Sequence, residues 1–222
     1  MFFFSSKVME DNERSLIEGR ACLEAALSYL KLGWSVLALC PPDHVGVGLV
    51  YRDHIKTCDS PGKRPWHSWK EYQSRLPTDR EVNGWWDQLC NSNVGIALGP
   101  VSKLIRIDVE GQSGEAKLLE MSGGDLPKTL EFSSGREGGG RGLLYAIPDG
   151  AVLRTTYEKP KAGEEVRLQA KGAQTVLPPS RHPSGKKYIW MAGCGPTDIK
   201  ATMAPSWLLA KLTAKADGRL VR

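Results

Sequence analysis

The chain has 222 residues, of which 41% are hydrophobic and 25% charged, proportions typical of a globular protein. No apolar run approaches the ~20 residues that a membrane-spanning helix needs, which excludes integral membrane classes and predicts no membrane partner. The net charge of +5 suits a polyanionic partner, although ordinary enzymes reach it too, so charge alone decides nothing. At this length we expect one sizeable core and a single catalytic-type domain.

The cysteines and the first residues both indicate a cytoplasmic protein. The run Met1-Phe2-Phe3-Phe4 is shorter than the apolar region of about 7–15 residues in a secretory signal. The cysteines are odd in number and scattered, which favours reduced thiols over a disulfide framework. They are Cys22, Cys40, Cys58, Cys90 and Cys194.

The N-terminal part is predicted to hold a tail, a helix and a strand. After a flexible tail over residues 1–14, Ser15 and Glu18 have the spacing of a capping box. An apolar stripe of leucines then predicts a helix over residues 16–31 that ends at Gly33. The apolar run over residues 34–39 predicts a core strand, which Pro41 and Pro42 end.

Four side chains of metal-ligating type lie in a long predicted loop over residues 40–69. Cys40, His44, His54 and Cys58 form the pattern C-x3-H-x9-H-x3-C, and these residue types suit tetrahedral zinc. The spacing is not that of a standard zinc finger, and Cys40 also fits the end of a strand. The pattern therefore leaves two interpretations open, a zinc site or unrelated thiols and imidazoles.

The same loop ends in Pro61-Gly62-Lys63-Arg64-Pro65, where two prolines stiffen the backbone around two cations. A solvated basic turn is one interpretation. The other is a rigid loop that holds Lys63 and Arg64 toward phosphate at low entropic cost. We favour the second because of the acidic strand described next.

Residues 104–110, Leu-Ile-Arg-Ile-Asp-Val-Glu, read as a buried strand that ends in acid. Side chains alternate along a strand, so Asp108 and Glu110 face the same way with α-carbons about 6.5 Å apart. Two such carboxylates suit a hard divalent cation, Mg²⁺ or Mn²⁺. Chance solvated strand ends show the same triplet, so its neighbours decide between the two interpretations.

Further elements surround this strand. Thr78 and Glu81 form a capping box that opens a helix through Leu89, and residues 93–99 predict a strand beside the acidic one. A helix is expected over residues 114–121, and a glycine-rich loop over residues 133–142 carries Arg136 and Arg141, whose charge suits an anion. Strands are expected over residues 130–132, 143–147, 164–168, 174–177 and 188–190, and a last helix over residues 206–215.

In this order the segments resemble the prim-pol branch of the archaeo-eukaryotic primase superfamily, the N-terminal bifunctional DNA primase/polymerase domain of phage, plasmid and mobile-element replication proteins. The resemblance covers about residues 25–190. It is carried by GWSVLAL, PGKRP with Trp69, the pair Trp85-Trp86, NVGIALG, LIRIDVE, LPKTLEFSSG, GGRGLLY, EEVRL, and VLPPSRHPSG with Tyr188.

The resemblance implies an α/β (α+β) fold, with an RRM-like catalytic sheet, flanking helices and a smaller helix-bearing N-terminal subdomain. It implies a catalytic domain over residues 15–195, followed by a C-terminal helix and tail over residues 196–222. Asp108 and Glu110 stand where the family has its paired metal-binding acids. Glu165 stands where the family has its third acid, and both glutamates replace the commoner Asp.

By this resemblance the activity is template-directed nucleotidyl transfer with two Mg²⁺ or Mn²⁺ ions, on a DNA template and primer with dNTP or NTP. A helicase domain or subunit is the further partner that the family implies. The expected nucleotide and DNA contacts are Lys63, Arg64, Ser134, Arg141, Arg167, Ser180, Arg181 and His182. For His182, a surface imidazole beside Pro183 is the alternative.

One position departs from the family. Gly142 stands where members carry a histidine that contacts the triphosphate, and Arg141, or Lys63 and Arg64, are the candidate replacements. Because of this departure, a second interpretation stays open, in which the chain is a replication module that binds nucleic acid and nucleotide with weakened catalysis. A metal-dependent nuclease that uses the same acids is the third alternative.

Overall fold

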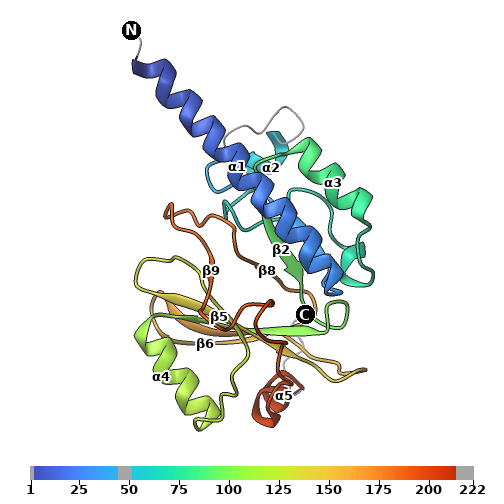
Figure 1. The fold of residues 1–222 in the computed structure, drawn as a ribbon. Coiled ribbons are helices and arrows are strands. Elements are labelled where there is room, and N and C mark those ends of the chain that lie inside the picture. The colour runs from blue at the N-terminus through green and yellow to red at the C-terminus, as the bar shows by residue number, and fades with distance from the viewer. Residues whose placement is uncertain (1–2, 45–51, 214–222) are drawn as a thin grey trace.

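A computed structural model describes residues 3–44 and 52–213. The described chain forms two antiparallel sheets and five α-helices, so the predicted α+β class is confirmed (Figure 1). The expected tail beyond residue 213 lies outside the described residues. In the described parts, none of the helices is both long and apolar enough to span a bilayer.

The elements alternate irregularly between helix and strand. The helices are α1 (Phe3–Lys31), α2 (Arg52–Thr57), α3 (Asp79–Gln88), α4 (Gly111–Ser122) and α5 (Ser206–Thr213), with a 3₁₀ turn, η2, at Glu71–Gln73. The strands are β1 (Val36–Leu39), β2 (Asn93–Ala97), β3 (Leu104–Glu110), β4 (Leu130–Ser133), β5 (Gly140–Ala146), β6 (Thr156–Lys161), β7 (Glu164–Gln169), β8 (Gln174–Val176) and β9 (Ile189–Trp190).

The larger sheet has the order β6-β7-β3-β5-β4-β9, so the acidic strand β3 lies at its centre. Its four central strands, β7-β3-β5-β4, follow the order of the expected RRM-like sheet. Helices α4 and α5 cover one face, where Ile105, Ile107 and Val109 of β3 pack with Leu118 and Leu208 (Figure 1). Because side chains alternate, the residues between those three face away from the helices.

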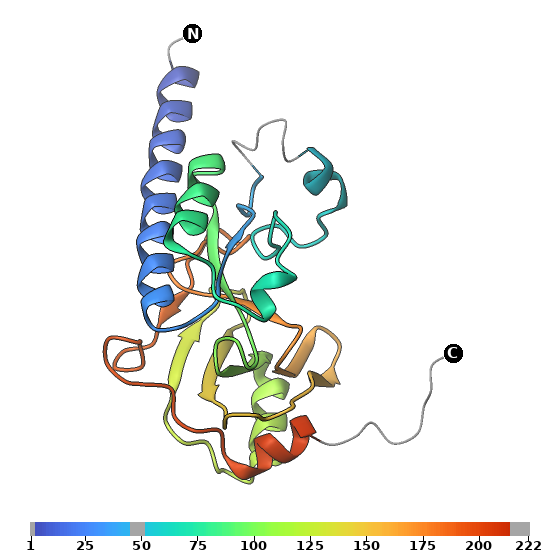
Figure 2. The same cartoon turned by 90° about the vertical axis from the view of Figure 1, so that its right-hand side faces the viewer.

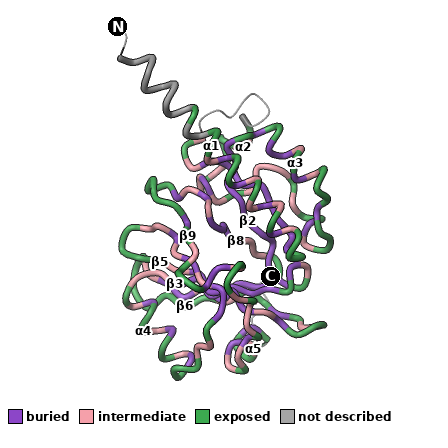
Figure 3. Tube along the Cα trace, viewed as in Figure 1, coloured by how far each residue is buried: buried purple, intermediate pink, exposed green. Residues whose placement is uncertain are grey.

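The smaller sheet, in the order β1-β2-β8, packs with α1 and α3 in a second core. Figure 3 shows β2 as buried, and in β8 only Gln174 is partly exposed. Strand β2 pairs with β1 and β8, whereas the sequence predicted that it would lie beside the acidic strand. Strand β1 is short and wholly apolar, and β8 is only the three residues Gln174–Val176, so neither segment's own pattern specifies the strand with which it pairs.

Helix α1 starts at Phe3, so the expected tail over residues 1–14 is helical from Phe3 onward, and Ser15 lies inside the helix rather than at its cap. No glycine or proline interrupts residues 3–18, which explains the continuation. The buried side of α1 is also narrower than predicted. It consists of Gly19, Cys22, Ala26 and Tyr29, while Leu16 is exposed.

Small residues bring α1 close to the rest of its core. Figure 2 shows α1 and α3 side by side. A Cβ added at Gly19 would lie 1.8 Å from the carbonyl oxygen of Cys90, which follows α3. Glycine at this position is therefore required by the close approach of the two backbones.

The other elements follow the prediction with three additions, which are the short helix α2 inside the predicted loop, the turn η2 and the strand β6. The capping box of α3 is confirmed, because Thr78 Oγ1 accepts from Glu81 N at 3.2 Å and Glu81 Oε2 accepts from Thr78 N at 2.7 Å. Strand β6 was not predicted from the sequence. It is an exposed edge strand with charges and a proline, features that protect sheet edges and hide the alternating pattern.

We predict that Gly19→Ala lowers the melting temperature by several degrees, since overpacking costs about 1–3 kcal/mol. The matched control is Gly84→Ala in α3, where an added Cβ meets nothing within 4 Å. Gly84→Ala should raise stability by up to ~1 kcal/mol through helix propensity. Thermal unfolding followed by circular dichroism measures both, and equal shifts in the two variants would contradict the packing of α1.

Candidate active site

The neighbouring strands β3 and β7 bring three carboxylates onto one face of the larger sheet. Asp108 and Glu110 alternate with the core residues of β3, so both face away from α4 and α5. In the antiparallel register, Glu110 is directly opposite Glu165 of β7. Opposite residues have Cβ atoms about 4.5–5.5 Å apart. The third acid is therefore beside the first two.

Asp108 and Glu110 line a cavity of about 390 Å³ between the two sheets, and Glu165 is beside Glu110 in the strand register. The larger sheet contributes Arg106, Asp108 and Glu110, and β8 of the smaller sheet contributes Thr175. The loop that ends at Pro65 contributes Lys63 and Arg64. Polar and charged side chains therefore line the cavity from both layers.

Each of the three acids has an arginine partner. Arg106 donates to Asp108, Arg167 donates to Glu165, and Arg136 Nη1 lies 2.5 Å from Glu110 Oε2. Arg106 and Arg167 come from the same two strands as the acids. Positive and negative groups thus alternate across the sheet face, which compensates the repulsion among the carboxylates.

The compensation is incomplete at Glu110. Burial and then the charge of Asp108 raise its pKa, which Arg136 counteracts, and Glu165 raises it further. A carboxylate whose ionised form is disfavoured in the fold gains most from a cation, and all three candidate ligands are the hard oxygens that Mg²⁺ and Mn²⁺ prefer. The residues therefore fit divalent cations.

The opposite wall of the cavity is basic. Burial lowers the pKa of Lys63, and the charges of Glu110 and Asp108 act against that shift. Arg64 pairs with Asp59 at 2.7 Å, and Ser134 lines the cavity beside the glycine-rich loop. The structure thus brings Lys63, Arg64 and Ser134 to the acids.

His182 also lines this cavity, which favours its functional interpretation over a surface imidazole. Burial lowers its pKa first, followed by the charges of Lys63 and Arg136. Its Nδ1 accepts from the backbone N–H of Ser184 at 3.1 Å. The neutral ring therefore carries its proton on Nε2, the remaining nitrogen.

Arg141 is a correction to the expected contacts. It is opposite Val109 in the sheet register, so it lies on the helix-covered face. There it pairs with Glu115 at 2.6 Å and Glu131 at 3.0 Å. Arg136, on the same glycine-rich loop, reaches the acids instead.

Ser180 and Arg181 are two more corrections. The Ser180 hydroxyl is fully buried, accepts from Val94 N at 2.9 Å and donates to Val94 O at 3.0 Å, so it fastens the chain to β2. Arg181 pairs with Glu18 of α1 at 3.1 Å and with Asp43 at 3.2 Å. Both residues serve the packing of the smaller layer rather than the cavity.

Arg106 is the residue that sequence reasoning missed. It is buried, donates to Thr175 Oγ1 at 2.8 Å and lies over the Phe132 ring. A Cβ added at Gly142 would be 2.5 Å from Phe132 Cζ and 2.7 Å from Arg106 Nε. The space of the family histidine is thus taken by the Phe132 ring and the Arg106 guanidinium. Alternation along β3 was the available signal, because Arg106 precedes Asp108 by two.

The four Cys and His residues of the early loop also come together, outside the acidic cavity. Their ligand atoms all lie within 4.8 Å of one another. Within the described residues, none of the five cysteines forms a disulfide.

We predict that Glu110→Gln raises the melting temperature at neutral pH without divalent cations. An acid whose folded-state pKa is raised destabilises the fold once pH passes its unfolded value of about 4.3, so removing the charge relieves a cost. Glu164→Gln is the matched control, because hydrogen bonds from Ser113 lower the pKa of Glu164 and its charge favours folding. Thermal scans should give opposite signs, and a lower melting temperature for Glu110→Gln would contradict the crowding of the acids.

We predict that Gly142→His lowers stability by about 1–3 kcal/mol through overpacking, and does not raise nucleotide affinity as expected if the position were simply vacant. Gly142→His should cost less stability in the Phe132→Ala background than in the wild-type chain, because removal of the ring makes room for the imidazole. Denaturant unfolding of the four combinations measures the coupling. Additive effects would show that the ring does not fill this space.

No curated protein sequence matches the chain. A family model does, the one described as bifunctional DNA primase/polymerase, N-terminal, and the match covers residues 26–207. That range includes both sheets, the three acids and the basic loop. The chain therefore belongs to the bifunctional DNA primase/polymerase (prim-pol) family.

Proposed function

We propose that the chain catalyses template-directed transfer of a nucleotide to a DNA primer, by a two-metal mechanism, in the replication of a phage or mobile element. Family membership gives primase/polymerase-type nucleotidyl transfer in general terms. The observation that carries the specific proposal is that Asp108 and Glu110 line one cavity whose other wall is basic, with Glu165 opposite Glu110 in the sheet register.

The carboxylate oxygens of Asp108, Glu110 and Glu165 would hold the two Mg²⁺ or Mn²⁺ ions. When bound, such ions lower the pKa of a primer 3′-hydroxyl and neutralise the triphosphate. The raised pKa of Glu110 supports this assignment, since a cation would stabilise its ionised form.

The cationic side chains would bind phosphate. Lys63, Arg64 and His182 line the cavity across from the acids, and the Nε2–H of His182 is a hydrogen-bond donor. Arg106, Arg136 and Arg167 neutralise the acids in this structure, and each has further N–H donors for the triphosphate. Because the template selects the base by pairing, these contacts need only grip backbone and phosphate.

The substrates proposed are a DNA template and primer with dNTP or NTP. A helicase domain or subunit is the further partner that the family resemblance suggests. A cytoplasmic location remains a proposal that accords with the free thiols.

A nucleotide-binding replication module of weakened catalysis is the second candidate. Gly142 favours it, because the space above this residue holds Phe132 and Arg106. The two proposals differ in turnover alone, so they are separated by product analysis.

We predict that the wild-type chain lengthens a labelled primer on a template with dNTPs and Mn²⁺, and that Asp108→Asn and Glu165→Gln each lower the rate by at least about 10²-fold. Glu164→Gln is the matched control, because its carboxylate accepts from Ser113 N at 2.7 Å on the α4 side of the sheet. It should keep the wild-type rate.

Gel analysis of the primer separates the alternatives. Unchanged primer with retained nucleotide binding would indicate the non-catalytic module. Shortened primer would indicate a nuclease. Either result in the wild-type chain, or full activity in Asp108→Asn, contradicts the proposal.

A further inference from the structure

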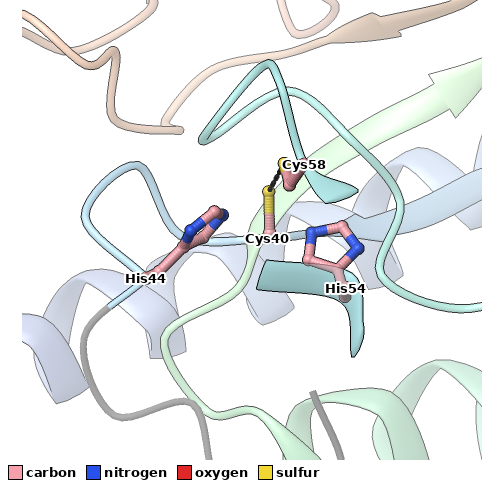
Figure 4. Close-up of side chains that lie close together, drawn as sticks. All are labelled: Cys40, His44, His54 and Cys58. Atoms are coloured by element: carbon pink, nitrogen blue, oxygen red, sulfur yellow. Dashed lines mark hydrogen bonds between the residues drawn. The ribbon is translucent and has the colours of Figure 1, made fainter. Parts of the chain in front are cut away.

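The loop between β1 and the basic turn contains a second cluster of ligands, separate from the acids. Cys40 follows β1, His44 lies in the turn after it, His54 belongs to α2, and Cys58 follows α2. Figure 4 shows their side chains pointing toward one another from these separate segments. One ligand atom from each lies within 4.8 Å of all the others.

The distance between the two sulfur atoms is that expected for two thiolates bound to one metal ion. Cys40 Sγ and Cys58 Sγ are 3.8 Å apart. With Zn–S bonds of about 2.3 Å at the tetrahedral angle, two thiolates on one zinc are about 3.8 Å apart, whereas a disulfide needs about 2.05 Å. The observed distance therefore matches ligation and not a covalent bond.

The two imidazoles each lack a partner for one buried nitrogen. The Nε2 atoms of His44 and His54 are buried without a hydrogen bond, and the rings are 5.7 Å apart. His44 also has a φ of 54°, a left-handed conformation that is costly for a residue with a side chain. A bound cation would satisfy unpartnered ring nitrogens in two imidazoles that cluster with two thiols.

The loop has little else to hold it. Among residues 41–44 and 52–65, no aliphatic or aromatic side chain other than Pro41 is buried, and Ile55 is exposed. A segment without its own apolar core commonly depends on a metal for its order. Two thiolates with two imidazoles select zinc, since magnesium and calcium prefer oxygen ligands.

We propose that Cys40, His44, His54 and Cys58 bind one Zn²⁺ ion whose role is to hold residues 40–44 and 52–65, and with them Lys63, against the acidic cavity. All four positions are protein ligands, which is typical of a structural rather than a catalytic zinc.

Short connections link the zinc site to Lys63. Cys40 N donates to Arg64 O at 2.8 Å, and Arg64 pairs with Asp59, the residue after Cys58. On the far side of the turn, Gln174 Nε2 donates to Lys63 O at 2.6 Å. Asn93 of β2 also donates from Nδ2 to Gly62 O at 2.9 Å. Zinc would therefore add a constraint on the Cys40–Cys58 side of the basic turn. This consequence for nucleotide binding rests on the proposed function, whereas the metal site itself does not.

The metal site is tested by elemental analysis of the full chain, purified under reducing conditions with zinc supplied and then dialysed. We expect about one zinc per chain in wild type and its loss in Cys58→Ser and His54→Asn. Cys90→Ser is the matched control, because Cys90 is an exposed free thiol outside the cluster. It should keep the zinc.

Thermal unfolding guards against variants that merely misfold. A strong zinc chelator should lower the melting temperature of wild type and Cys90→Ser, and added Zn²⁺ should restore it. The proposal is overturned if the wild-type chain contains no zinc and its melting temperature does not change with the chelator. So does a chain lighter by two hydrogens in its mass spectrum, which would indicate a Cys40–Cys58 disulfide.

The link to Lys63 is tested with a fluorescent dNTP analogue. Removal of zinc should weaken the affinity of the wild-type chain for the analogue roughly tenfold, which is the effect of one charged phosphate contact. In Lys63→Ala, which already lacks that contact, removal of zinc should change the affinity little. Equal weakening in both would overturn the link. Failure of wild type to bind the analogue at all would instead contradict the proposed function, with the zinc content still deciding the metal site.

Discussion

The antiparallel pairing of β3 with β7 is the constraint on which the site depends. It sets Glu110 opposite Glu165 and Asp108 opposite Arg167. A shift of the register by one residue would turn every second side chain to the helix-covered face and separate the acids. The apolar residues between them, Ile107, Val109 and Val166, are fully buried and hold that register in place.

The two layers of the molecule contribute opposite charges to one cavity. The larger sheet supplies the carboxylates and their arginines, and the smaller layer supplies Lys63, Arg64 and His182. The proposed zinc would belong to the smaller layer and would use sulfur and nitrogen, while the proposed catalytic ions would use only oxygen. Because the two donor sets differ, each kind of ion has a site that suits it better than the other.

Much of this arrangement could be predicted from the sequence. The alternation in residues 104–110 predicted that Asp108 and Glu110 share a face. The pattern of Cys40, His44, His54 and Cys58 left a zinc site and unrelated side chains both open, and the structure brings the four together. The position of Glu165 came from the family resemblance, because its place opposite Glu110 depends on a register that no single segment encodes.

The errors arose where alternation was not applied or where distant segments decide. Arg141 shares its face with Leu143 and Tyr145, both in the helix-side core, so counting along β5 would have excluded it from the cavity. Arg106 could have been found by the same count. The Phe132 ring beside Gly142 and the partners of Arg181 depend on segments far apart in the chain, which a local pattern does not specify.

The most direct test of the central claim is a crystal of the chain soaked with Mn²⁺ and a non-hydrolysable dNTP analogue, with anomalous difference maps recorded at the manganese edge. The account predicts two peaks among the carboxylates of Asp108, Glu110 and Glu165, with the triphosphate extending toward Lys63 and His182. Peaks elsewhere, or a well-ordered nucleotide with no manganese at these carboxylates, would contradict it.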